Sequence, residues 1–288
     1  GEFDRKLNLV NITVNAPKQS VTSNPVDIHA QGVDFWPLAL ARELDDLILH
    51  LRTNEPELGL WVFRTQGDAD LVAEADKVLA DNADDWLVRE VSLFLKRVLK
   101  RIDVTSRSII TLVEPGSCFT GTLAELLFAA DRSFMLDGVM KEGDTPATVR
   151  LTSANFGDYP MCNDLTRLQT RFLDDDASVE AAKAAIGKDL DAASVEELGL
   201  VTFIPDDIDW EDEVRVSIEQ RVAMSPDSLT GMEASLRFAG PETLETKIFG
   251  RLSAWQNWIF QRPNAVGAEG ALKLFGSGKR AGFDMNRV

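Results

Sequence analysis

The segment best suited to chemistry is Gly116-Ser117-Cys118-Phe119-Thr120-Gly121-Thr122-Leu123-Ala124-Glu125, which follows the apolar run 109–113. It predicts a buried strand, a glycine-containing turn and the start of a helix. The first turn of a helix has free backbone N–H groups, and such donors stabilise negative charge on a carbonyl oxygen. Glu125 lies one helical turn after Thr122, where a carboxyl group could act as a general acid or base. A plain strand–turn–helix with an acidic first turn accounts for the same pattern.

Cysteine and histidine residues offer little further chemistry. Cys118 could be a nucleophile, but no histidine partner is evident, and a buried cysteine is more often a small core residue. His29 and His50 lie far apart without cysteines around them, so we expect no metal site. Two cysteines, Cys118 and Cys162, do not make a disulfide framework and indicate a reducing, cytoplasmic compartment.

Charge and hydropathy exclude several classes of partner. The formal net charge of -17 repels phosphate backbones and anionic membranes, so we expect no nucleic acid and no membrane partner. No apolar run approaches the ~20 residues that span a bilayer, and the N-terminus lacks a signal-peptide pattern. A small anionic ligand remains compatible with this charge, because a helix N-terminus can bind it locally.

Apolar periodicity predicts alternating strands and helices. Strands are expected over 7–14, 59–63 and 109–113, and helices over 38–54, 71–79, 86–102 and 121–130. This alternation favours an α/β fold with covered strands. Further helices are expected near 177–186, 194–198, 211–224 and 227–237, then a long amphipathic helix over 242–260 and an extended arm over 267–288.

Four ordered stretches resemble the crotonase (enoyl-CoA hydratase/isomerase) superfamily. The stretch 108–131 has a strand, a glycine-rich turn and an aspartate six residues after Glu125. The stretches 65–76, 155–168 and 193–201 look like the first oxyanion loop, the segment with the second acid and the helix after the site. The resemblance implies an α/β, crotonase-like (ClpP/crotonase) spiral of ββα units over 1–224 and a helical C-terminal extension over 225–288. It also implies a coenzyme A thioester as substrate, with no cofactor.

Longer runs resemble one lyase family within this superfamily. They are similar to the C-terminal half of the benzoyl-CoA-dihydrodiol lyases, which open the ring of a dihydroxylated benzoyl-CoA in benzoate degradation. The runs are 41–46, 51–55, 116–119, 224–227 and 254–260. This resemblance implies a larger parent protein, with a better-preserved site in an N-terminal half and a dimerising C-terminal helix.

The superfamily resemblance assigns a role to each site position. Glu125 takes the place of a catalytic acid, and Ser153 takes the place of the second acid. The backbone N–H groups of Ala73 and Thr122 take the place of the oxyanion hole, both within about 3 Å of one point.

Three departures from the superfamily pattern indicate an incomplete site. Leu123 is bulky where a glycine lets the backbone approach the thioester, and Glu74 replaces a glycine in the first oxyanion loop. Ser153 replaces the second acid, and a hydroxyl without an adjacent base is no acid or base at neutral pH. We therefore expect the oxyanion hole to be spoiled and two-carboxylate hydration to be lost.

The C-terminal helix carries an apolar stripe that suits either an internal core or a two-fold interface. The stripe comprises Phe249, Leu252, Trp255, Trp258 and Ile259, and aromatic residues are enriched at interfaces. We expect Trp255 and Trp258 to be buried against protein, and the partner to be a second copy or an N-terminal crotonase half.

Three functions are compatible with the sequence. The chain could be a degenerate half that scaffolds and dimerises a CoA-ester lyase. It could be a self-sufficient acyl-CoA hydratase or isomerase that uses Glu125. It could also be a module that binds acyl-CoA or benzoyl-CoA-type ligands without turnover.

Overall fold

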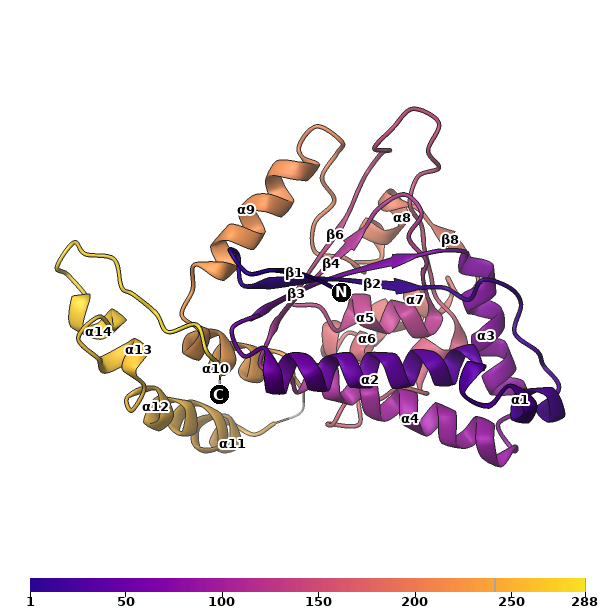
Figure 1. The fold of residues 1–288 in the computed structure, drawn as a ribbon, viewed down its shortest axis with the longest axis horizontal. Helices are drawn as coiled ribbons and strands as arrows, with labels where there is room; N and C mark the ends of the chain where they lie inside the picture. The colour runs from indigo at the N-terminus through magenta and orange to yellow at the C-terminus, as the bar shows by residue number, and fades with distance from the viewer. Residues whose placement is uncertain (241, 288) are drawn as a thin grey trace.

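The computed structural model describes residues 1–240 and 242–287. Its main sheet has five strands in the order β1-β2-β3-β4-β6 (Figure 1). β1 pairs antiparallel with β2, and the other neighbours pair in parallel. The strands are β1 (Glu2–Asp4), β2 (Leu9–Asn15), β3 (Leu60–Gln66), β4 (Ser108–Val113) and β6 (Arg132–Met135).

Helices cover both faces of the main sheet, which explains the continuous apolar runs of its inner strands. In β3, Trp61 and Phe63 join one apolar cluster, whereas Leu60 and Val62 join the other, because successive side chains point to opposite faces. The first cluster packs against α2 (Trp36–Asn54) and α4 (Trp86–Asp103), and the second packs against α9 (Trp210–Val222). Figure 1 shows α2 and α4 on one side of the sheet and α9 on the other.

A smaller sheet leads into the segment 116–125, which the sequence predicts as the site of chemistry. Its order is β5-β7-β8, from strands Phe119–Thr120, Val149–Arg150 and Asp189–Leu190. β5 runs directly into the 3-10 turn η2 (Gly121–Leu123) and the short helix α5 (Ala124–Phe128). The helix predicted over 121–130 is therefore present as two short pieces.

The predicted helices and strands are largely confirmed, and aspartates cap several helices. The side chains of Asp68, Asp85, Asp175 and Asp191 accept first-turn N–H groups, as N-cap residues do. The other elements up to residue 236 are α1 (Pro25–Gln31), η1 (Gly32–Asp34), α3 (Ala69–Asp81), η3 (Ser153–Phe156), α6 (Arg167–Arg171), α7 (Asp176–Lys183), α8 (Ala192–Glu197) and α10 (Pro226–Leu236).

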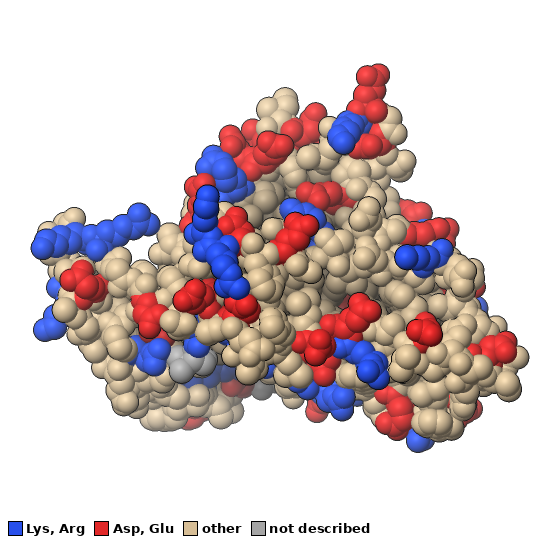
Figure 2. Space-filling view, viewed as in Figure 1, with Lys and Arg blue, Asp and Glu red and all other residues tan. Residues whose placement is uncertain are grey.

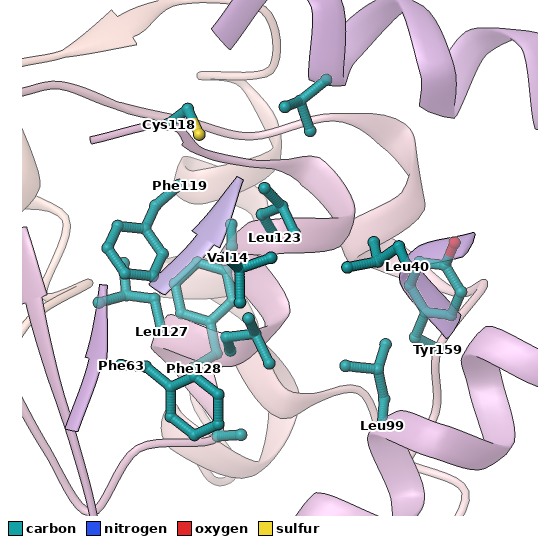
Figure 3. Packing of buried hydrophobic residues seen from close by; sticks show 14 of the residues in the cluster. Val14, Leu40, Phe63, Leu99, Cys118, Phe119, Leu123, Leu127, Phe128 and Tyr159 are labelled. Carbon is teal, nitrogen blue, oxygen red and sulfur yellow. The ribbon is translucent and has the colours of Figure 1, made fainter. Parts of the chain in front are cut away.

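The core beneath the site is built from large apolar side chains. Figure 3 shows Phe63, Phe119, Leu123 and Leu127 gathered in one cluster. Leu123 is 1% exposed, so the residue that departs from the glycine pattern serves as a core residue. Burying such a side chain contributes ~2 kcal/mol.

The C-terminal segment projects from the body and then returns to it (Figure 1). The helix predicted over 242–260 is present as α11 (Leu244–Thr246), the π-helix η4 (Lys247–Leu252) and α12 (Ser253–Ile259). Two short helices follow, α13 (Pro263–Val266) and α14 (Ala271–Leu274). The extended arm predicted over 267–288 is only partly correct, since α14 is helical and the Arg287 N–H donates to the Pro56 carbonyl at 3.2 Å.

The residues of the predicted apolar stripe differ in how far they are buried. Trp255 and Trp258 are half-buried, with Trp255 facing Gly231 of α10 and the two rings edge to face at 5.2 Å. Phe249 and Leu252, by contrast, are 72% and 63% exposed. The expectation that both tryptophans are buried is thus met only in part within one chain, because the helix touches the body mainly through α10.

α10 is attached firmly to the main sheet. Its Glu233 accepts a hydrogen bond from the Ser108 hydroxyl of β4, and Arg237 just after it pairs with Asp131. The part that projects begins after α10, while the division of the chain at residue 224 stays a prediction. No helix among the described residues has the length and hydropathy needed to cross a membrane.

Candidate functional site

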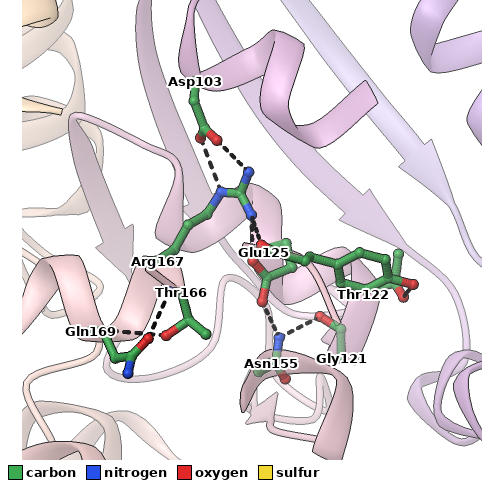
Figure 4. A network of polar contacts seen from close by, with 9 residues as sticks. Asp103, Gly121, Thr122, Glu125, Asn155, Thr166, Arg167 and Gln169 are labelled. Carbon is green, nitrogen blue, oxygen red and sulfur yellow. Dashed lines mark hydrogen bonds and ion pairs between the residues drawn. The ribbon is translucent and has the colours of Figure 1, made fainter. Parts of the chain in front are cut away.

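Glu125 lies inside the protein, on α5, and its carboxylate is fully engaged. It is 2% exposed. Arg167 Nη1 donates to Oε2 at 2.7 Å, and Asn155 Nδ2 donates to Oε1 at 2.7 Å. Asn155 also donates to the Gly121 carbonyl, which fixes the amide between the turn and the carboxylate (Figure 4).

Arg167 joins Glu125 to a second buried carboxylate. Its Nε and Nη2 donate to the two Asp103 oxygens at 3.0 and 2.6 Å, a bidentate pair. Its Nη1 also donates to the Tyr159 carbonyl at 3.0 Å. Burial raises the pKa of Glu125 and of Asp103, although the Arg167 charge opposes both shifts. This geometry holds α4, α5 and α6 together rather than presenting an acid to a ligand.

Thr122, a predicted oxyanion donor, already has a partner. Its N–H donates to Asp76 Oδ2 at 2.9 Å, and its hydroxyl donates to Asp76 Oδ1 at 2.5 Å. Thr152 donates its hydroxyl to Oδ2 at 2.8 Å. Burial raises the pKa of Asp76 to about 6, against the three hydrogen bonds that favour its ionised form.

Ala73, the other predicted oxyanion donor, lies in the second turn of α3. Helix α3 begins at Ala69 after its Asp68 cap, so the Ala73 N–H points along the helix toward the carbonyl four residues earlier. The two predicted donors are therefore not free and not directed at one point. Glu74, expected to spoil the hole, is half-buried on the same helix.

Ser153 is exposed at the start of η3, whereas Glu125 is buried. The residue that reaches Glu125 from this segment is Asn155, two positions on. The structure thus brings together Glu125, Asn155 and Arg167, and leaves Ser153 at the surface. The motif in the stretch 155–168 predicts a second acid. It does not predict that Asn155 and Arg167 of this stretch bind the Glu125 carboxylate.

The cysteine and metal expectations concern residues outside this network. Cys118 is buried, its N–H donates to the Thr65 hydroxyl, and burial raises the pKa of its thiol. A buried thiol with a raised pKa is a poor nucleophile. His29 pairs with Asp85 at the surface. Among residues 1–240 and 242–287, no group of three or more His, Cys, Asp or Glu could hold a metal ion.

A large open groove lies away from Glu125. It has a volume of about 890 Å³ and is formed by β2, the loop 16–21 and α2. Val14, Leu40 and Leu44 give it an apolar wall. Lys18 supplies a positive charge at the loop, and Asp34 and Glu43 supply negative charges. Such a mixture of apolar wall and few polar groups is typical of small-molecule sites.

One comparison with known sequences gives a clear relative. No family model matches the chain. Over 97% of its length the chain is 56% identical to benzoyl-CoA-dihydrodiol lyase of Aromatoleum evansii, and it spans about half of that protein, 50%.

Solved structures show the fold. An enoyl-CoA hydratase of Mycobacterium smegmatis has a TM-score of 0.66 at 14% identity, covering 98% of this chain and 96% of that one. An enoyl-CoA hydratase/isomerase of Cupriavidus metallidurans CH34 has a TM-score of 0.64 at 19% identity, covering 99% and 95%. The predicted fold is therefore confirmed. The chain has the crotonase fold, and its sequence is homologous to one half of benzoyl-CoA-dihydrodiol lyase.

Proposed function

We propose that this chain is the C-terminal, non-catalytic half of a benzoyl-CoA-dihydrodiol lyase, and that it acts by assembly with the catalytic half. The observation that carries the proposal is the engagement of Glu125. A general acid must reach the proton that it transfers. Glu125 is 2% exposed and has both oxygens bound by Arg167 and Asn155, so no carboxyl is available at this turn.

The assembly role is supported by the projecting C-terminal segment. Six of its large apolar side chains are more than half exposed: Leu244, Phe249, Leu252, Phe260, Leu272 and Phe275. Exposed apolar side chains concentrated on one segment mark interaction sites. The face over α11 and α12 is mostly uncharged, whereas basic side chains gather at the tip (Figure 2).

The partner in this proposal is the remaining half of the lyase, and the assembly forms a homodimer through the C-terminal helix. The homologous lyase is about twice as long as this chain. The substrate would be a coenzyme A thioester held by the other half, with no cofactor. The assembly would work in the cytoplasm, in benzoate degradation.

The test is to produce the chain with and without the other half of the lyase. We expect a stable complex by sedimentation and conversion of benzoyl-CoA dihydrodiol by the complex alone. The double variant F249S/L252S should weaken the complex. Val26→Ser is the matched control, since Val26 is 74% exposed but lies on α1. Turnover of crotonyl-CoA by the chain alone, lost in Glu125→Gln, would contradict the proposal and favour a self-sufficient hydratase.

The large open groove favours a second candidate, the binding of a CoA ester without turnover. Its apolar wall suits an acyl group, and Lys18 is the cation that would face a phosphate, against the negative charges of Asp34 and Glu43. Calorimetry with benzoyl-CoA would decide between them. A saturable heat that is lost in Lys18→Ala but kept in Lys6→Ala supports binding, and no heat in the wild type excludes it.

A further inference from the structure

The N–H group of Thr122, a predicted oxyanion donor, already faces a negative group, the side chain of Asp76. One backbone N–H and two hydroxyls converge on its carboxylate at 2.5 to 2.9 Å, from Thr122 and Thr152. Donors that converge on one small charged group at these distances are what an oxyanion site requires. The donors come from η2 and from the cap of η3, while the carboxylate comes from α3.

The donors are held in place by contacts of their own. The Tyr159 hydroxyl lies 3.0 Å from Thr122 Oγ1. Thr152 Oγ1 accepts the Ala154 N–H while its proton is directed at Asp76, because Thr152 is the N-cap of η3. The pocket is therefore organised by elements that do not depend on Asp76 itself.

Gly121 gives the carboxylate its space. A Cβ at this position would lie 1.7 Å from Asp76 Oδ2 and 2.6 Å from Thr152 Oγ1. Its φ of +47° also lies in the left-handed region that favours glycine. Because Gly121 has no Cβ, the turn leaves room for an oxygen atom at the position that Asp76 Oδ2 occupies.

We propose that Asp76 is a built-in occupant of a latent oxyanion site, and that the pocket of Thr122 and Thr152 binds a small free carboxylate once this side chain is removed. The inference rests on the proposed non-catalytic role, for which it gives a second reason. A thioester oxygen cannot approach the Thr122 N–H while a carboxylate oxygen lies 2.9 Å from it.

The experiment is a chemical rescue of Asp76→Gly with formate, which replaces the lost carboxylate without needing the space of a methyl group. Melting temperatures of the full chain are compared in sodium formate and sodium chloride at equal ionic strength. We expect the variant to melt below the wild type and formate to raise its melting temperature by several degrees, in a saturating manner. The wild type should respond equally to the two salts.

Two further variants make the outcome decisive. Asp158→Ala removes a neighbouring exposed carboxylate and should respond to formate as the wild type does. Asp76→Ser removes the carboxylate with a smaller loss of volume, and it replaces Asp76→Gly if that variant does not fold in either salt. If neither Asp76 variant gains more from formate than Asp158→Ala does, in melting or in refolding, the proposal is overturned.

The two proposals fail separately. Absence of formate rescue would remove the latent site but leave the assembly with the other half untouched. Turnover of a CoA thioester by the wild-type chain would contradict the non-catalytic role, whatever formate does to the variants.

Discussion

At the scale of single residues, Glu125 shows why the sequence could locate the site but not its chemistry. The strand, the glycine turn and the acid were all visible in the stretch 116–125. Its partners, Asn155 and Arg167, lie 30 and 42 residues away. No local pattern states whether a carboxylate faces a ligand or an arginine, so the acid could be identified and its engagement could not.

The buried pair of carboxylates around Arg167 predicts a large cost for its removal. Arg167→Leu leaves Asp103 and Glu125 buried without their cation, and breaking a buried ion pair costs about 3–5 kcal/mol. The free energy of unfolding, from urea titration, should fall by about that amount. Arg215→Leu breaks two exposed pairs, with Asp212 and Glu219, and should cost under about 1 kcal/mol. Equal losses in the two variants would contradict the buried-network interpretation.

Asp76 predicts a dependence of stability on pH. Its pKa is raised from 3.8 to about 6 by burial, so the folded protein holds the proton more tightly than the unfolded chain. The stabilisation from this proton is fully present below pH 3.8 and is lost as the pH rises through about 6. A shift of this size corresponds to about 3 kcal/mol.

The measurement is the free energy of unfolding of wild type minus Asp76→Asn, taken at several pH values. The difference should fall as the pH rises from 4 to about 6 and then stay level. A difference that rises over this interval would mean that the hydrogen bonds from Thr122 and Thr152 outweigh burial.

At the scale of elements, the predictions succeeded where periodicity was strong and failed where a helix boundary decided the chemistry. The helices over 36–54 and 86–103 have long apolar stripes and were located within two residues. The helix predicted over 71–79 would place the Ala73 N–H in its free first turn, yet Ala73 lies in the second turn because Asp68 starts α3 at Ala69. The sequence Gly67-Asp68 after a strand was the signal that could have placed this start.

Asp68 should therefore control the stability of α3. Asp68→Ala removes the acceptor of the Asp70 N–H, and the loss of an N-cap costs about 0.5–2 kcal/mol. Asp81→Ala, at the exposed C-terminal end of the same helix, should cost under about 0.5 kcal/mol. Thermal unfolding of both variants checks the prediction. A larger loss in Asp81→Ala than in Asp68→Ala would show that the cap does not hold this helix.

At the scale of the whole molecule, the order of motifs was sufficient for the fold, but the path of the C-terminal segment was not predictable. Arg287 donates from Nε to the Ser106 carbonyl at 2.7 Å, across 181 residues of sequence. The last stretch is rich in glycine and basic residues, which is a pattern typical of a free arm. Arg287, near its end, is only 8% exposed, so this part of the stretch is attached to the body and is not a free arm.

The return of the segment depends on Gly59, and this gives the last prediction. A Cβ at Gly59 would lie 2.0 Å from Arg287 Nη1, so Gly59→Ala should displace the guanidinium and release the end of the chain. Arg287→Ala should release it without changing the turn at 59. Losing about 1.4 kcal/mol of docking free energy raises the undocked population about tenfold.

Limited trypsin cleavage at Lys279 and Arg280 measures that population and should be faster in both variants. Gly157→Ala is the matched control, because Gly157 has open space around its Cβ position. If Gly59→Ala is cleaved at the same rate as Gly157→Ala, the C-terminal segment stays docked even when the Arg287 guanidinium is displaced from Gly59.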